Sequence, residues 1–214
     1  MNDLAGIYSP DDTALLIVDP YNDFISEGGK LWDAVKDVAK SIDLLDHMRA
    51  VLATVRERGI RVLIVPHHQT APNDYRSWGH LSPTQRRVLE RQTFAVGSWG
   101  AQWHPDFVPL EGELVASQHW ASSGFANTDL DMLLKQHHIT KVLIIGMKAN
   151  TCVDTTARFA QELGYHVTLV RDAIGAFSWD EMTATFDINA PQYAHAIHTT
   201  DELLQLLSHR KARA

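Results

Sequence analysis

Six short runs of apolar residues are spaced along the chain and predict the strands of a buried sheet. Each run is bounded by polar or turn-forming residues, which is typical of strands covered on both faces. The runs are "TALLIVD" (13–19), "RVLIVP" (61–66), "ELVASQ" (113–118), "KVLIIGM" (141–147), "YHVTLV" (165–170) and "AHAIHT" (194–199).

The stretches between these runs have the three- and four-residue apolar spacing of amphipathic helices. The longest, residues 34–58, stops before Gly59 and has apolar positions at Val35, Val38, Ile42, Leu45, Met48, Leu52 and Val55. Further helices are predicted over residues 83–92, 129–138, 153–163, 179–190 and 201–209. The predicted starts of the last four are Asn127 or Thr128, Thr151 or Cys152, Ser178, and Thr199 or Thr200.

Apolar strands that alternate with amphipathic helices predict a doubly wound α/β fold, with a mostly parallel six-stranded sheet and helices on both faces. Such three-layer, Rossmann-like sheets bind ligands beyond the carboxyl ends of their strands. Asp19, His67, His68, His119 and Cys152 all follow or close predicted strands, so we expect the functional site among them. No G-x-G-x-x-G follows the first strand, which disfavours a dinucleotide site.

Residues 67–112 interrupt the alternation of strands and helices. This segment is rich in Trp, His, Pro and Gly and has one predicted helix, residues 83–92. Long connections of this kind are usually functional lids or interface elements. The cluster of Trp78, Trp99 and Trp103 is therefore interpreted as lid packing or a subunit contact.

Composition and charge exclude several classes of protein. A chain of 214 residues with 45% hydrophobic residues predicts one globular domain. A single cysteine cannot form an internal disulfide, and no secretory pattern opens the chain, so we expect a reducing cytoplasm. No apolar run approaches the roughly 20 residues of a membrane span. A net charge of −7 disfavours nucleic acid as a partner and leaves a small-molecule substrate.

Cys152 is the first candidate for chemistry. A buried structural cysteine is the more common case, but Cys152 lies at a strand-to-helix junction. There, unpaired amides and the helix dipole favour a thiolate and can hold an oxyanion. Asp19 and His119 lie at the same predicted edge of the sheet. Asp19 could remove the thiol proton, and His119 could supply charge or a proton. Taken alone, an aspartate like Asp19 more often caps or bonds to loop amides, and His119 could be only a polar residue at a strand end.

The histidines His67, His68, His80 and His104 raise the alternative of a metal site. Neighbouring residues of an extended segment point to opposite sides, so His67 and His68 do not readily face one ion. No close His-x-His or Asp-x-His spacing appears either. We therefore predict no metal and no organic cofactor.

Three longer motifs together resemble the isochorismatase-like cysteine hydrolase superfamily. They are "ALLIVDPYNDF", "SSGFANTDLD" and "GMKANTCVDTTARFAQELGYHVTLVRDA", and the resemblance extends from about residue 11 to residue 206. It implies a single domain over residues 1–214, with residues 67–112 as a lid or interface segment. It also implies a homo-oligomer, either a dimer or a tetramer.

The resemblance implies Cys152 as nucleophile and Asp19 as base. It further implies a cis peptide between Met147 and Lys148, which directs the amides of Lys148 and Cys152 into an oxyanion hole. The position that the family fills with lysine is His119 here, counted back from Phe125. Either His119 shuttles a proton in a cysteine–histidine pair oriented by a carboxylate, or Asp19 alone is the base and His119 only bonds to it.

The expected reaction is hydrolysis of a small amide or related C–N bond through a thioester on Cys152. Nicotinamidases of the same superfamily bind a metal through an Asp-x-His pattern that "PHHQTAPNDY" does not reproduce. The predicted pocket is mostly apolar. Its residues are Tyr21, Phe24, His67, His68, Trp78 and Phe125. The alternatives are an isochorismatase-type vinyl-ether hydrolase, in which the cysteine is dispensable, and a pseudoenzyme that only binds small molecules.

Overall fold

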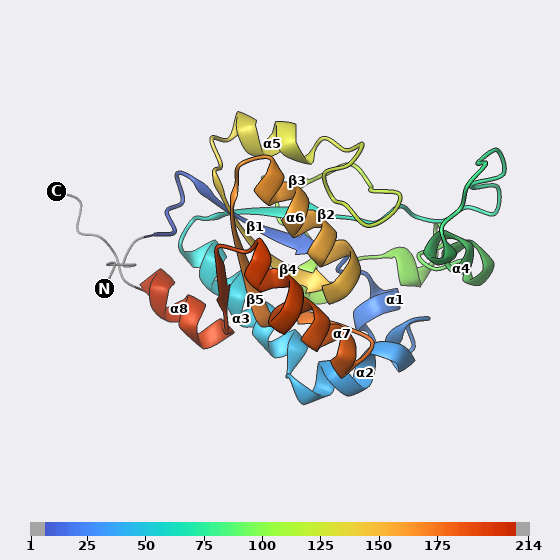
Figure 1. Ribbon diagram of the computed structural model, residues 1–214, viewed down its shortest axis with the longest axis horizontal. Helices are drawn as coiled ribbons and strands as arrows, with labels where there is room; N and C mark the ends of the chain where they lie inside the picture. The colour runs from blue at the N-terminus through green and yellow to red at the C-terminus, as the bar shows by residue number, and fades with distance from the viewer. Residues whose placement is uncertain (1–6, 209–214) are drawn as a thin grey trace.

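The computed structural model describes residues 7–208. Its six strands form one parallel sheet in the order β3-β2-β1-β4-β5-β6, which confirms the predicted doubly wound architecture (Figure 1). The strands are β1 (Thr13–Val18), β2 (Arg61–Val65), β3 (Leu114–Val115), β4 (Lys141–Met147), β5 (His166–Gly175) and β6 (Ala196–His198).

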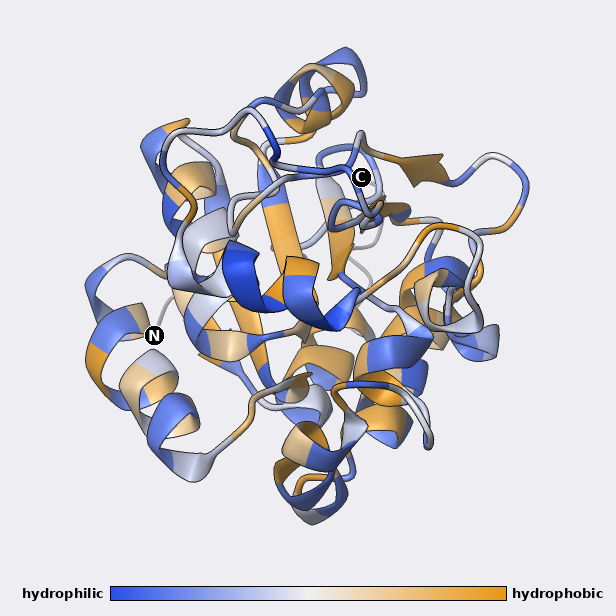
Figure 2. Ribbon diagram, turned by 90° about the vertical axis from the view of Figure 1, so that its right-hand side faces the viewer, coloured by the Kyte–Doolittle hydropathy of each residue, from blue (hydrophilic) through white to orange (hydrophobic). Residues whose placement is uncertain are grey.

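Helices cover both faces of the sheet and complete two apolar cores. One core receives α2 (Trp32–Ser41), α3 (Leu44–Glu57) and α8 (Thr200–Ser208). The other receives α5 (Leu130–Gln136), α6 (Asp154–Glu162) and α7 (Trp179–Thr183). Figure 2 shows helices that alternate between hydrophobic and hydrophilic colours around strands that are largely hydrophobic. The predicted amphipathic pattern therefore corresponds to buried and exposed helix faces.

The predicted helix 34–58 is two helices, because the chain breaks between α2 and α3. Asp43, which precedes α3, has a φ of 48° in the left-handed region. Ile42 at the break still packs against both cores, so the apolar spacing continues although the helix does not. Periodicity reports the buried face and is insensitive to a single turn of backbone.

Several predicted boundaries shift. Residues 113–118 yield only the two-residue β3, whereas β5 extends beyond 170 to Gly175. The helix predicted over 129–138 begins after Asp129, and Asn127 has a positive φ. Ser178 does cap α7 by accepting from the Glu181 N–H, and the Thr199 hydroxyl accepts from the Glu202 N–H. Position 209 of the last predicted helix lies outside the described residues.

The segment 67–112 contains α4 (Pro83–Arg91), close to the prediction, and two 3-10 turns, η1 (Trp99–Ala101) and η2 (Pro105–Phe107). Figure 1 shows α4 and the loop before it projecting from one end of the sheet. The buried Asp23 carboxylate of the short helix α1 (Asn22–Ile25) accepts from the Phe94 N–H at 2.7 Å and the Lys30 N–H at 3.0 Å. This carboxylate ties the segment to the chain that follows β1.

Among residues 7–208, no helix combines the length and the apolar character that crossing a bilayer requires.

Candidate active site

Asp19 directly follows β1, at the carboxyl edge of the sheet. Its N–H donates to the Val65 carbonyl at 3.0 Å, and its φ of 51° turns the chain out of the strand. The residue before it, Val18, pairs with Gly146 of β4. A Cβ on Gly146 would lie 2.2 Å from the Val18 carbonyl oxygen, so only glycine allows β4 to approach the Asp19 turn this closely.

His119 reaches the same edge without a long third strand. Its N–H donates to the Pro66 carbonyl at 2.9 Å, and its carbonyl accepts from the His68 N–H at 2.8 Å. These two bonds form an isolated parallel bridge between His67 and His119. The third strand is therefore shorter than predicted, but parallel pairing resumes at His119, which reaches the site.

Cys152 follows β4 within the π-helical turn η3 (Ala149–Val153), which runs directly into α6. The Met147–Lys148 peptide before this turn is cis, as the family resemblance implied. Neither Thr151 nor Cys152 is the N-cap of α6, because the helical turn has already begun at Ala149. Cys152 therefore lies one turn inside the helical segment.

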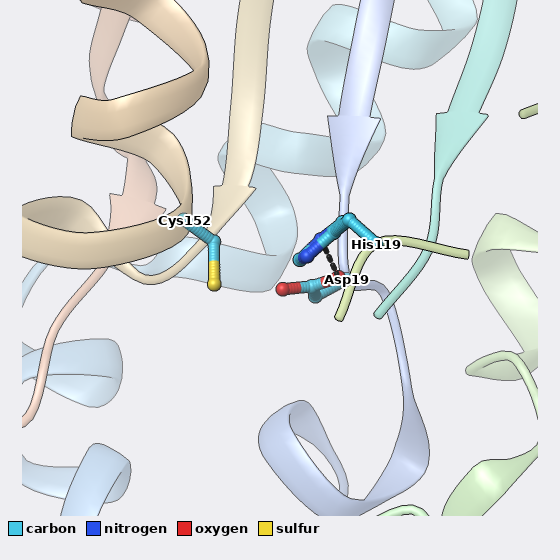
Figure 3. A group of neighbouring side chains, drawn as sticks. All are labelled: Asp19, His119 and Cys152. Atoms are coloured by element: carbon cyan, nitrogen blue, oxygen red, sulfur yellow. Dashed lines mark hydrogen bonds and ion pairs between the residues drawn. The ribbon is translucent and has the colours of Figure 1, made fainter. Parts of the chain in front are cut away.

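The three side chains converge in a buried cluster (Figure 3). The Asp19 Oδ1 and the His119 Nε2 are 3.1 Å apart. One carboxylate oxygen of Asp19, one ring nitrogen of His119 and the Cys152 Sγ all lie within 4.8 Å of one another. Asp19 and His119 are fully buried and Cys152 is 7% exposed. The second carboxylate oxygen, Asp19 Oδ2, has no hydrogen-bond partner among the described residues. A free oxygen beside a thiol is an available proton acceptor.

The hydrogen-bond partners of the His119 ring indicate which of its nitrogens carry a proton. Its Nδ1 lies 3.1 Å from the Ala121 carbonyl oxygen, which can only accept, so Nδ1 carries a proton. Its Nε2 then faces the Asp19 Oδ1, which is also an acceptor when ionised. One further proton must lie between Nε2 and Oδ1 for this contact to be favourable.

The Cys152 side chain is a neutral thiol at rest. Burial raises its pKa well above the ordinary value, and the negative charge of Asp19 raises it further, whereas the Thr151 hydroxyl and the Lys148 charge oppose this. The thiolate expected from a helix start is thus not the resting form, because desolvation outweighs the helix end. A nucleophilic Cys152 needs a base, and Asp19 is adjacent.

Lys148 is close to this cluster, but its ammonium group is bound elsewhere. Nζ donates to Glu181 of α7 at 2.6 Å and to Asn150 at 2.7 Å, and it lies 4.4 Å from the Phe177 ring centroid. The backbone N–H of Lys148 has no acceptor among the described residues. Its amide is therefore free for a ligand while its side chain is not.

His67 lies beside the cluster and His68 does not. The His67 ring is 5.1 Å from that of His119, and its Nδ1 is 2.9 Å from the His68 carbonyl oxygen. Burial lowers the pKa of His67 to about 4, with the nearby Asp19 charge opposing and the His119 charge adding to the decrease. His68 instead stacks on Trp120 at 3.5 Å and pairs with Asp74 at 2.8 Å. The two rings diverge, as their adjacency predicted.

The remaining predicted pocket residues are not gathered in one place. The buried Tyr21 hydroxyl donates to the His67 carbonyl at 2.8 Å, and Phe24 shares its core. Phe125 shares the opposite core with Cys152. Trp78 is 44% exposed and packs on Trp120. Their common role in substrate binding stays a prediction.

Two cavities lie away from the cluster. One of about 290 Å³ is lined by Ile42, Arg171, Asp172, Trp179, Met182, Thr183, Asp187 and Thr199. A second, of about 190 Å³, lies over α2 and the start of α3, next to Trp32 and Arg49. Neither is lined by a predicted site residue.

Sequence reasoning missed three groups that position the cluster. The Ala121 carbonyl contacts both His119 Nδ1 and Cys152 Sγ, the latter at 3.9 Å. The Thr151 hydroxyl lies 3.9 Å from the same sulfur. Glu181 binds the Lys148 side chain. Thr151 is next to Cys152 in the sequence and could have been predicted. The Ala121 carbonyl and the Glu181 carboxylate come from distant parts of the chain, and no sequence pattern indicates them.

Comparison with known proteins places the chain among relatives. Residues 13–201, which include all three clustered side chains, match the family model of the Isochorismatase domain. The chain belongs to the isochorismatase family. This membership confirms the resemblance in "ALLIVDPYNDF" and "GMKANTCV" and makes the chain a hydrolase of that family.

Two similar curated proteins are ureidoacrylate amidohydrolases RutB. That of Cronobacter turicensis is 28% identical over 176 residues, covering 78% of this chain and 75% of the relative. That of Klebsiella pneumoniae is 28% identical over 176 residues, with 78% and 74% covered.

Solved structures of the family share the fold. A cysteine hydrolase from Pseudomonas syringae pv. phaseolicola superimposes with a TM-score of 0.77 at 21% identity, covering 94% of each chain. N-carbamoylsarcosine amidase from Thermoplasma acidophilum gives 0.63 at 28% identity, covering 89% of this chain and 97% of that one. The isochorismatase family fold thus spans nearly the whole chain.

Proposed function

We propose that this protein is a cysteine hydrolase that cleaves a C–N bond of a small amide or carbamoyl compound through a thioester on Cys152. The observation that carries the proposal is the buried Asp19 carboxylate, which has an oxygen within 4.8 Å of the Cys152 Sγ and whose Oδ2 has no partner among the described residues. The activities of two relatives, ureidoacrylate amidohydrolase and N-carbamoylsarcosine amidase, support the same bond class.

In the first step, Cys152 Sγ attacks the substrate carbonyl carbon and its proton passes to Asp19 Oδ2. Because burial keeps the thiol protonated, attack and proton transfer must be coupled. The negative oxygen that forms is held by the backbone amides of Lys148 and Cys152. Asp19 then gives the proton to the leaving nitrogen, the C–N bond breaks, and ammonia or an amine departs.

In the second step, water attacks the thioester carbon while Asp19 removes one of its protons. The C–S bond breaks, the acid leaves and the sulfur regains a proton. No oxidant or organic cofactor takes part.

His119 holds Asp19 in place through the 3.1 Å contact and leaves Oδ2 to face the thiol. Its anchorage on the Ala121 carbonyl fixes the ring. This arrangement supports a role for His119 as the partner of Asp19, at the position that resembles the family lysine. The substrate would contact the neighbouring His67 and Tyr21, with Phe24, His68, Trp78 and Phe125 farther out.

A panel of small amides, ureido acids and carbamoyl compounds, read by ammonia release, tests the proposal. We expect turnover of at least one compound by the wild type and none by Cys152→Ala. Ammonia release that survives Cys152→Ala would contradict the thiol as nucleophile, and cleavage of an added vinyl ether by both proteins, without ammonia from any panel compound, would indicate a vinyl-ether hydrolase. Tight binding of panel compounds without release of any product would indicate a pseudoenzyme.

We also propose that the chain works in the cytoplasm as a dimer or tetramer. The exposed Trp78 and Trp99, 44% and 49% accessible, support segment 67–112 as the interface. The single free cysteine suits a reducing compartment. Light scattering of the wild type and of Trp99→Ser tests the oligomer, because loss of an interface tryptophan should reduce the measured mass.

A further inference from the structure

The catalytic cluster has the composition of a soft-metal site. A thiol, an imidazole nitrogen and a carboxylate converge, with their donor atoms all within 4.8 Å of one another. Thiolate and imidazole ligands favour Zn²⁺ over Mg²⁺ or Ca²⁺. This set is distinct from the His67 and His68 pair, whose rings diverge and whose sequence pattern argued against a metal.

Charge balance in the cluster favours a divalent cation. Asp19 and a Cys152 thiolate would carry two negative charges, and His119 would be neutral as a ligand. One Zn²⁺ would therefore make the buried set electrically neutral, which lowers the cost of burying its charges. A lysine at position 119 would have supplied a positive charge and no ligand, whereas histidine supplies a ligand.

The nearby cationic side chains do not occupy this role. Lys148 is bound to Glu181 and Asn150. The His67 ring is held by its Nδ1 contact of 2.9 Å with the His68 carbonyl oxygen.

A contact outside the cluster already holds His119 in an orientation that suits metal binding. A metal-binding histidine commonly donates its other ring N–H to a carbonyl, which fixes the tautomer. His119 Nδ1 makes this contact with the Ala121 carbonyl at 3.1 Å, so Nε2 is the nitrogen that faces the cluster. The buried Asp19 Oδ2 has no other partner among the described residues.

The required movement is small. Tetrahedral zinc places its sulfur, nitrogen and oxygen ligands roughly 3.3 to 3.6 Å from one another, given Zn–S near 2.3 Å and Zn–N or Zn–O near 2.0 to 2.2 Å. His119 Nε2 and Asp19 Oδ1 are already 3.1 Å apart. Among the residues that the structure describes, Cys152 Sγ makes two hydrogen-bond contacts, both of 3.9 Å, and it is the atom that must approach.

We propose that Asp19, His119 and Cys152 bind one Zn²⁺ per chain and that the ion blocks the nucleophile. Binding forms bonds from the metal to Sγ, to Nε2 and to a carboxylate oxygen. The thiol proton and the proton shared by His119 and Asp19 leave to solvent, and no electron is transferred. Metal binding does not depend on the proposed hydrolase function, whereas the resulting inhibition does.

The test measures binding without substrate. Zn²⁺ competes against a chromophoric chelator, and Co²⁺ reports thiolate ligation by a charge-transfer band in the near ultraviolet. We expect one Zn²⁺ per wild-type chain and unchanged binding in His80→Lys, an exposed matched control. Loss of a group that only hydrogen-bonds to a metal ligand weakens metal affinity about 10- to 100-fold. Removing the ligand itself in His119→Lys should weaken Zn²⁺ binding by more than about 100-fold, and Cys152→Ser should abolish the Co²⁺ band.

A second measurement keeps the proposal falsifiable if a variant does not fold. In the wild type, stoichiometric Zn²⁺ should protect Cys152 from iodoacetamide, a chelator should restore labelling, and Mg²⁺ should have no effect. Absence of stoichiometric binding to the wild type, or equal affinity in folded His119→Lys, would overturn the zinc site. Either result leaves the ammonia-release test of the hydrolase untouched, so the two proposals fail separately.

Discussion

Gly146→Ala should be severe because it forces β4 away from the turn that carries Asp19. Gly146 pairs with Val18, the residue immediately before Asp19, and has a φ of +114°. An added Cβ would lie 2.2 Å from the Val18 carbonyl oxygen and 2.8 Å from the Val18 nitrogen. These are backbone atoms within the sheet, so no side-chain rotation relieves the overlap.

Two costs add at this position. A side chain in a backbone region that L-residues avoid costs about 1–2 kcal/mol. Overpacking of a well-filled interior adds about 1–3 kcal/mol, so Gly146→Ala should lower the free energy of unfolding by about 2–5 kcal/mol. A displacement of Asp19 by about 1 Å can also reduce the rate about 100-fold, because proton transfer depends on position.

Gly164→Ala is the matched control. Gly164 also has a positive φ, +91°, but an added Cβ has no atom within 4 Å. Urea unfolding followed by circular dichroism should show a loss of about 1–2 kcal/mol for Gly164→Ala and an unchanged rate of ammonia release. Stability and activity of Gly146→Ala equal to those of Gly164→Ala would refute the close approach of β4 to Asp19.

Three further predictions address the charges of the site. His67 is buried and has a pKa lowered to about 4, so as the pH falls the unfolded chain takes up this proton before the folded protein does. The contribution of His67 to the free energy of unfolding should be full above pH 6.5 and fall by about 3 kcal/mol between pH 6.5 and 4. His67→Gln should flatten that decline in urea titrations, whereas exposed His80→Gln should not. Asp19→Asn removes a charge that raises the Cys152 pKa, so the thiolate absorbance should titrate at lower pH than in the wild type while amide hydrolysis is lost. A titration midpoint that is unchanged or higher would contradict the electrostatic assignment. His119→Gln should lower kcat/KM about 100-fold or more, and His119→Lys should lower it less, since lysine places a cation beside Asp19. Equal losses would show that His119 acts only through its shape.

The sheet was predictable because parallel strands buried on both faces produce continuous apolar runs. The third strand is shorter than predicted because, beyond the bond from the Ala116 N–H to the Ile64 carbonyl, pairing resumes only at the isolated bridge between His67 and His119. The end of β5 was missed because Arg171 and Asp172 interrupt the apolar run while the backbone stays extended. The break between α2 and α3 was missed because it depends on the backbone of Asp43, whose φ is 48°, and apolar periodicity does not report backbone angles.

The cluster itself was predictable because the carboxyl ends of β1 and β4 must meet at one edge, together with the segment after β3. Asp19, His119 and Cys152 therefore came together as expected. The protonated state of the thiol was not predictable, because it depends on burial that only the packed structure defines. The Ala121 carbonyl and the Glu181 carboxylate likewise enter through tertiary contacts.

In the proposed mechanism, Cys152 forms a covalent acyl intermediate. Acid quenching of the wild type during turnover of an active panel compound, followed by intact-mass and peptide mass spectrometry, detects that intermediate. We expect an added mass equal to the acyl or carbamoyl group on the peptide that contains Cys152, accumulating further in a variant with slowed hydrolysis and missing in Cys152→Ala. Continued turnover by Cys152→Ala with no adduct at any quench time would contradict it.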